Sequence, residues 1–76
     1  MENRVIIARE RFYDKSGFVG SIEFLFSTYE LAYQHYIDHH FTVEPKFRGA
    51  KKFYPETGIS PIIRCVVNFF DEPVKA

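Results

Sequence analysis

Two histidines four residues apart, His35 and His39, are the clearest candidates for a metal site in this chain of 76 residues. Residues at positions i and i+4 project from the same side of a helix, so both imidazoles could reach one ion. A zinc site needs three or four ligands, and spacing alone does not provide the third. Imidazoles near a helix C-terminus are also favoured by the helix dipole without any metal. We therefore expect no metal and no cofactor, and keep the His35 and His39 pair as an alternative.

Nucleophilic or acid–base catalysis finds little support in the sequence. The single cysteine, Cys65, lies on the apolar side of a two-residue period and is expected to be a buried, unreactive thiol. The serines lack the glycine pattern of a nucleophile elbow, and the glycines form no phosphate-binding loop. Carboxylates are not paired at convincing positions. We predict that the protein is not an enzyme.

A segment of mixed basic and aromatic residues could contact nucleic acid or an acidic partner. It comprises Lys46, Phe47, Arg48, Lys51, Lys52, Phe53 and Tyr54. Cations can meet phosphates while rings stack on bases. The whole chain nevertheless has equal numbers of acidic and basic residues, 10 of each, which disfavours binding of a long polyanion. Nucleic-acid binding is therefore kept as the alternative function.

Composition limits where and how the protein works. Its 76 residues allow one domain, and 46% hydrophobic with 26% charged residues is typical of a folded globular chain. The longest apolar stretches span three or four residues, far below the ~20 that cross a bilayer, and the first dozen residues carry too many charges for a secretory signal. One cysteine rules out an intramolecular disulfide framework. We expect a soluble, cytoplasmic protein that does not enter membranes.

Two strands in a hairpin are predicted for the first third of the chain. Residues 4–13 alternate with Ile6, Ala8 and Phe12 on one side, and residues 14–17 supply the turn. Residues 18–26 alternate again, and their strongest core signal is a face made of Phe18, Ile22, Phe24 and Phe26. Four large side chains on one face should pack against a helix or a second layer.

An amphipathic helix is expected over 28–40. Ser27 and Glu30 have the spacing of a capping box, which places the helix N-terminus there. The residues predicted to face the sheet are Tyr29, Tyr33, Tyr36, Ile37 and His40.

The rest of the chain reads less clearly. Residues 46–54 could be a strand or a loop, with Gly49 and Ala50 suggesting a bend, and 55–61 resemble a turn. Residues 62–70 are predicted as the final strand, near the centre of the sheet, and 71–76 as a mobile tail. The fold class is α+β: a small, mainly antiparallel sheet in the order β-β-α-β-β or β-β-α-β, with one helix packed on one face.

The second face of such a sheet is the main functional candidate. We expect the fourteen Phe and Tyr residues to exceed what one helix can cover. The candidate interface residues on the opposite parity are Val19, Leu25, Ile62, Val66 and Phe70. Alternatively, residues 41–61 could fold over this face and bury it. The first reading predicts a protein-binding module or a homodimer, in the style of small regulators and inhibitors, including those that bacteriophages encode.

Overall fold

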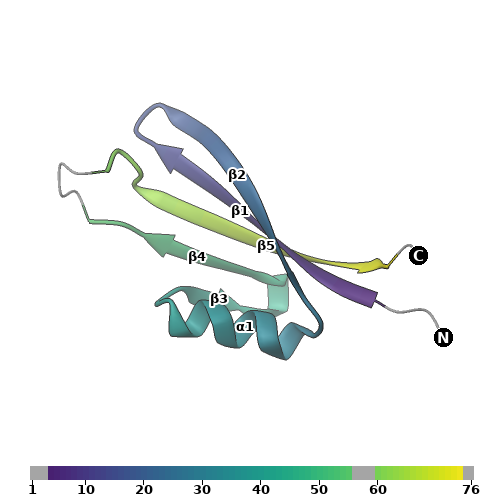
Figure 1. The fold of residues 1–76 in the computed structure, drawn as a ribbon. Helices are drawn as coiled ribbons and strands as arrows, with labels where there is room; N and C mark the ends of the chain where they lie inside the picture. The colour runs from purple at the N-terminus through teal and green to yellow at the C-terminus, as the bar shows by residue number, and fades with distance from the viewer. Residues whose placement is uncertain (1–3, 56–59, 75–76) are drawn as a thin grey trace.

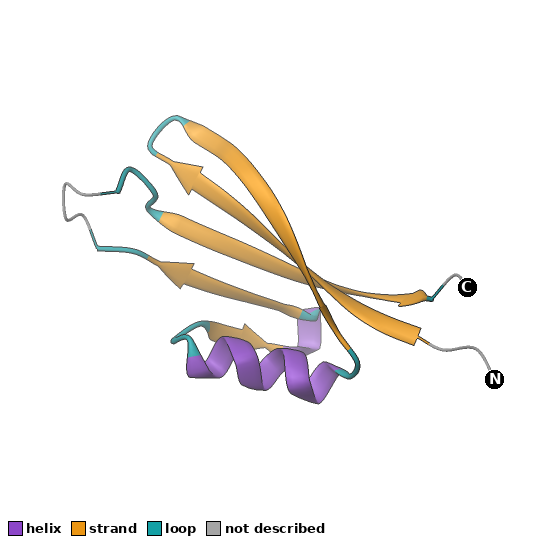
Figure 2. Ribbon diagram, in the orientation of Figure 1, coloured by secondary structure: helices purple, strands orange, loops and turns teal. Residues whose placement is uncertain are grey.

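An antiparallel sheet makes up most of the structure, and one helix lies on one of its faces (Figures 1 and 2). The structure is a computed structural model that describes residues 4–55 and 60–74. Its elements are β1 (Arg4–Asp14), β2 (Gly17–Phe26), α1 (Tyr29–Asp38), β3 (Thr42–Glu44), the 3-10 helix η1 (Pro45–Phe47), β4 (Gly49–Phe53) and β5 (Arg64–Pro73). The strands follow the order β2-β1-β5-β4-β3, and every neighbouring pair is antiparallel. The predicted α+β class is confirmed, and β5 is the middle strand.

Neither helix within 4–55 and 60–74 has the length and apolar character needed to cross a bilayer.

α1 begins and ends at residues that satisfy its free backbone groups. The Thr28 hydroxyl accepts a hydrogen bond from the Leu31 N–H at 3.2 Å, so the N-cap lies one residue later than the predicted Ser27. At the other end, His40 adopts a left-handed conformation with φ 66°. The N–H groups of His40 and Phe41 then donate to the carbonyls of Ile37 and Tyr36, which is a Schellman motif. This reversal carries the chain directly into β3.

Tyr36 anchors α1 on the sheet. Its side chain is fully buried, and its ring lies 4.9 Å from that of Phe41 and 5.5 Å from that of Phe69, both edge-on. Ala32 is the other fully buried residue of the helix. The core is completed by small and branched residues of β1, β4 and β5: Ile6, Ala8, Ala50, Cys65 and Val67.

The predicted sheet-facing side of α1 is partly wrong. Tyr29 and Tyr33 are half-buried, as expected of its margin, but Ile37 is 52% exposed. The reason is geometric, because Ile37 lies about 100° around the helix from the buried Tyr36. His40 is exposed because it comes after the last turn, where helical periodicity no longer applies.

The predicted core face of β2 is also only partly right. Ile22 and Phe24 do point to the side of the sheet that carries α1, yet they are 47% and 41% exposed. α1 contacts β2 near its C-terminal end, where His35 lies beside the rings of Phe24 and Phe26, and β2 is an edge strand of the described sheet. In Figure 1 the turn between β1 and β2 reaches away from the helix. Of the predicted face, Phe26 packs against the core.

Phe18 lies on the other face because the strand register shifts near the turn. Phe12 pairs with Gly20, but the next residue, Tyr13, pairs with Phe18 and leaves Val19 as an extra residue. The rings of Tyr13 and Phe18 lie 5.9 Å apart, and Phe18 is 61% exposed. Strict alternation along residues 18–26 therefore failed at one bulge.

Residues 42–54 resolve the ambiguity between strand and loop. Thr42–Glu44 form the short strand β3, which the sequence did not indicate, and η1 leads through a left-handed Arg48, with φ 47°, into β4. The turn falls at Arg48, one residue before the predicted bend, and at Gly49, the first residue of β4, a Cβ would lie 3.0 Å from the Val67 carbonyl oxygen. Glycine thus lets β4 approach β5 closely.

The last strand is longer than predicted at its C-terminal end. β5 continues to Pro73, so Asp71–Pro73 are not part of a tail. They are held by pairing with β1 and by an ion pair between Arg4 and Asp71 at 2.6 Å. Part of the predicted turn, 56–59, and the end of the predicted tail, 75–76, lie outside the described residues.

Candidate protein-binding face and cleft

One face of the sheet carries no helix, and we call it the open face. Its members follow from the strand register, because residues opposite each other share a face. They are Val5, Ile7, Arg9, Arg11 and Tyr13 of β1, Phe18, Ser21, Glu23 and Leu25 of β2, Lys51 and Phe53 of β4, and Arg64, Val66, Asn68 and Phe70 of β5. The described parts of 41–61 form β3, η1 and β4, which extend the sheet sideways. They do not fold over the open face as one interpretation had proposed.

Three of the predicted interface residues, Leu25, Val66 and Phe70, lie on the open face. Leu25, Ile7 and Phe70 form a continuous apolar row across three strands, with Leu25 67% and Phe70 37% exposed. Val66 lies between Arg11 and Lys51 and is half-buried. The other two predicted residues flank this surface. Val19 is exposed at the β2 bulge, and Ile62 precedes β5 in a half-buried position.

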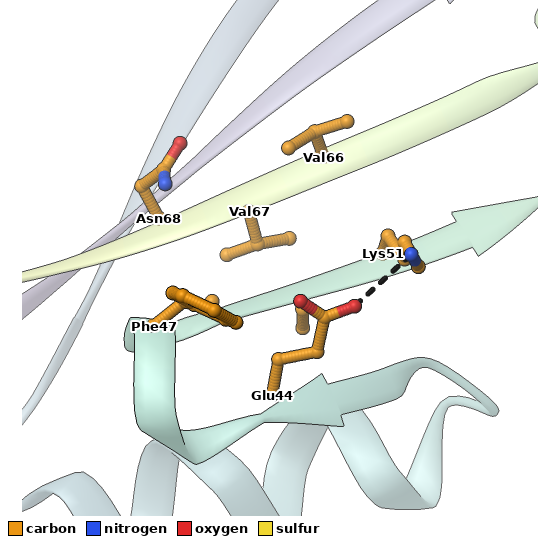
Figure 3. A pocket seen from close by; sticks show the side chains of 8 residues that line it. Glu44, Phe47, Lys51, Val66, Val67 and Asn68 are labelled. Atoms are coloured by element: carbon orange, nitrogen blue, oxygen red, sulfur yellow. Dashed lines mark ion pairs between the residues drawn. The ribbon is translucent and has the colours of Figure 1, made fainter.

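A shallow hollow of about 110 Å³ lies at the β3–β4–β5 end of the open face (Figure 3). Gly49 has no side chain, and this leaves space between Val66, Asn68 and the ring of Phe47. Phe47 is 72% exposed, and the Glu44–Lys51 ion pair, 3.0 Å long, borders the hollow. Its walls are mostly apolar, so it suits a protruding apolar side chain of a partner.

Charges on the open face are only partly neutralised. Arg9 pairs with Glu23 at 2.7 Å, and Lys51 pairs with Glu44. The Arg64 guanidinium stacks over the Tyr13 ring at 4.4 Å. Within 4–55 and 60–74, neither Arg11 nor Arg64 forms an ion pair with a carboxylate. These two arginines are therefore available to carboxylates of another molecule.

The predicted basic and aromatic segment is split by the sheet. Lys51 and Phe53 lie on the open face, whereas Lys52 and Tyr54 point to the side of α1. Lys46 and Phe47 are in η1, and Arg48 stacks over the Tyr29 ring at 5.0 Å. The structure therefore does not gather its four cations on one surface, and contact of this segment with nucleic acid or an acidic partner stays a prediction.

A cleft of about 370 Å³ lies on the other face, between the C-terminal half of α1 and the sheet. Aromatic rings form most of its walls: Phe12, Phe24, Tyr36, Phe41 and Tyr54. Its polar lining consists of Glu10, Lys52 and the two histidines that the sequence singled out. The His35 and His39 rings lie 4.3 Å apart, and His39 Nδ1–H donates to the His35 carbonyl at 2.8 Å. The predicted pair thus exists as one side of this cleft.

Glu10 is the buried polar residue that the sequence analysis overlooked. It is 8% exposed and lies in the core beside Ile6 and Ala8. Its Oε2 accepts a hydrogen bond from the Tyr36 hydroxyl at 2.8 Å, and its Oε1 accepts a weaker one from the Cys65 thiol at 3.8 Å. The sequence pattern does predict a buried position for Glu10, because Glu10 shares the two-residue period of the apolar side of β1. A glutamate at such a position is uncommon unless it has a partner.

The donors to Glu10 are held in their neutral forms. Burial, the hydrogen bond to Glu10 and the charge of Glu10 all raise the pKa of Tyr36. Burial and then the charge of Glu10 raise the pKa of Cys65 from 9.0 to about 12. The predicted buried, unreactive thiol is therefore found, since the thiolate is the reactive form and is strongly disfavoured here.

No protein-family model, curated protein or solved structure matches the chain.

Metal binding by the histidine pair lacks a third ligand in the described part of the chain. There, no group of three or more His, Cys, Asp and Glu side chains is arranged to hold an ion. His40, the third histidine, lies beyond the helix end and does not line the cleft. The cleft instead combines one buried carboxylate, one ammonium group and several rings, which is a chemistry for holding an organic molecule.

Proposed function

We propose that this protein is a non-enzymatic protein-binding module that contacts its partner through the open face. The observation that carries the proposal is the apolar row of Leu25, Ile7 and Phe70, which no described helix covers. Together with the hollow beside Gly49, it offers both a flat apolar contact and a socket for one anchoring side chain. Burial of this surface would supply the main free energy of association.

The partner is a protein surface that presents apolar and acidic side chains together. Arg11 lies beside Val66 on the open face, and Arg64 begins β5 opposite Tyr13; neither has a carboxylate partner among the described residues. Complementary carboxylates on a partner would select the correct orientation and raise the association rate. By covering its partner's surface, such a module acts as a regulator or inhibitor, and a second copy of the chain is the homodimeric variant of the proposal. We place it in the cytoplasm, where Cys65 stays reduced.

Photo-cross-linking in the native host tests which face meets a protein. A benzoyl-phenylalanine at Phe53, which is 67% exposed on the open face, should give one dominant protein adduct. The same probe at Leu31, which is 55% exposed on α1, serves as the control and should give none. Adducts from Leu31 alone, or from neither position, contradict the proposal.

The protein identified in this way is then purified and titrated against matched variants. Leu25→Asp and Leu31→Asp each replace one exposed leucine by a charge, one on the open face and one on α1. We expect L25D to weaken binding by about tenfold or more and L31D to leave it nearly unchanged. Equal losses in the two variants would refute an interface on the open face. Sedimentation of the chain alone shows whether the partner is a second copy.

Binding of single-stranded nucleic acid is the second candidate, supported by exposed rings beside arginines. Phe18 and Phe53 are 61% and 67% exposed on the open face, and Arg64 lies over Tyr13. Rings and guanidinium groups on an open sheet can stack on bases. Affinity for a labelled oligothymidine should then fall steeply with salt and be lost in Phe53→Ala. No binding at low salt rejects this candidate.

A further inference from the structure

The cleft under α1 contains a carboxylate that the fold itself does not neutralise. Glu10 accepts hydrogen bonds from two neutral groups, Tyr36 and Cys65, and forms no ion pair within the described residues. A buried carboxylate without a cation lowers the stability of a fold. Since a carboxylate has about four acceptor positions, Glu10 can still accept further donors. Glu10 also lines the cleft, so those donors can come from a ligand.

Lys52 places a positive charge in the same cleft. Its ammonium donates to the His39 carbonyl at 3.0 Å and lies over the rings of Phe41 and Tyr54, 5.5 and 5.2 Å from their centroids. One of its three N–H donors is used by that carbonyl, which leaves two for an anion. The histidine rings add further polar groups beside it.

The two opposite charges, Glu10 and Lys52, lie on either side of Cys65. Its sulfur lies 3.8 Å from Glu10 Oε1, and Lys52 is its partner in the register of β4 and β5. A ligand that engages both charges therefore needs an ammonium and a carboxylate in one molecule. The rings of Phe12, Phe24 and Phe41 surround the remaining space, which suits an apolar body.

We propose that this cleft binds a free α-amino acid with an aromatic or large apolar side chain. Its ammonium group donates to Glu10, its carboxylate accepts from Lys52, and its side chain packs among the rings. The volume of about 370 Å³ is within the range of small-ligand sites. The site lies on the opposite side of the sheet from the open face, so this proposal does not depend on the proposed protein-binding function.

Three matched probes separate the two charges. L-Phenylalanine carries both groups, 2-phenylethylamine lacks the carboxylate, and 3-phenylpropionate lacks the ammonium. Amide and ring resonances of the full chain, followed by NMR during each titration, should shift at cleft residues such as Lys52 and His35. We expect L-phenylalanine to bind at least about tenfold more tightly than either partial probe. No saturable shift at about 10 mM L-phenylalanine, or equal affinity for all three probes, overturns the proposal.

Two variants test which residue binds each charged group of the ligand, and a third variant is the control. Glu10→Gln should weaken L-phenylalanine and 2-phenylethylamine by about tenfold and leave 3-phenylpropionate unchanged. Lys52→Met should weaken L-phenylalanine and 3-phenylpropionate instead. Lys51→Met is the control, because Lys51 lies on the open face and pairs with Glu44. Thermal unfolding verifies that each variant is folded. Equal effects of E10Q and K52M on every probe, or an effect of K51M, contradict the assignment.

Discussion

β1 and β2 are paired along most of their length and share the same two-residue alternation, but they differ in burial. On the side of α1, β1 buries Ile6, Ala8 and Glu10, whereas β2 leaves Ile22 47% and Phe24 41% exposed. β1 has a strand on each side and a helix above it. β2 has one neighbouring strand and no helix over most of its length.

The difference shows that alternation determines the direction of a side chain but not whether anything covers it. α1 has only ten residues, and about 1.5 Å per residue makes it about 15 Å long. The longest dimension of the molecule is 49 Å. One short helix therefore protects a limited part of an elongated sheet, and the apolar residues beyond its reach stay at the surface. The open face, which the proposed function uses, is exposed for a different reason, because α1 lies on the other side of the sheet.

The largest expected effect comes from removing the anchor of the covered region. Tyr36→Ala should lower the free energy of unfolding by about 3–5 kcal/mol, because it leaves a cavity and takes a donor from Glu10. Phe24→Ala removes a comparable ring from β2, where it is 41% exposed, and should cost about 1 kcal/mol. Urea denaturation of both variants provides the comparison.

If Tyr36→Ala does not fold, Tyr36→Phe gives the same information on a smaller scale. It keeps the ring and removes only the hydroxyl, so we expect a loss of about 1–3 kcal/mol from the unsatisfied Glu10. A cost for F24A as large as that for Y36A would mean that β2 is covered after all.

Much of the fold followed from sequence patterns, and the departures have identifiable causes. The capping residue, the bulge near Val19 and the short β3 depend on local geometry that several residue types satisfy equally well. The length of β5 was underestimated because Asp71 and Glu72 look polar, although strand pairing with β1 holds them.

The candidate sites also contain some features that the sequence predicts and others that it does not. The open-face parity of Leu25, Val66 and Phe70 could be predicted, because alternation decides it. The contacts of Glu10 could not, because Tyr36 is 26 and Cys65 is 55 positions away along the chain. The hollow depends on the close approach of β4 and β5 at Gly49, which requires knowledge of their pairing.

Alkaline pH should act on the covered region, where Tyr36, Tyr54 and Cys65 have raised pKa values. The pKa of Cys65 rises from 9.0 to about 12, so the unfolded chain ionises first. The contribution of the neutral thiol is therefore complete below about pH 9 and is lost as the pH rises toward about 12. We expect the free energy of unfolding to decrease above about pH 9.

Cys65→Ala removes this titration and leaves the tyrosines in place. Its free energy of unfolding should be lower at neutral pH but should fall less steeply between about pH 9 and about pH 10. Urea midpoints measured across this range give the slope for each protein. Parallel pH profiles for the variant and the wild type would show that the thiol is not protected in its neutral form.

The smallest and sharpest comparison deletes one methyl group from each of the two paired strands. Ile6 and Ile22 point to the same side of the sheet, but they are 4% and 47% exposed. Ile6→Val should cost about 0.5–1.5 kcal/mol, and Ile22→Val should stay within about 0.5 kcal/mol. Urea midpoints at unchanged m-value measure both. A cost for I22V that equals that of I6V and grows with protein concentration would mean that a second copy covers β2, because association stabilises the folded chain by mass action. An equal cost independent of concentration would instead contradict the exposed position of β2 itself.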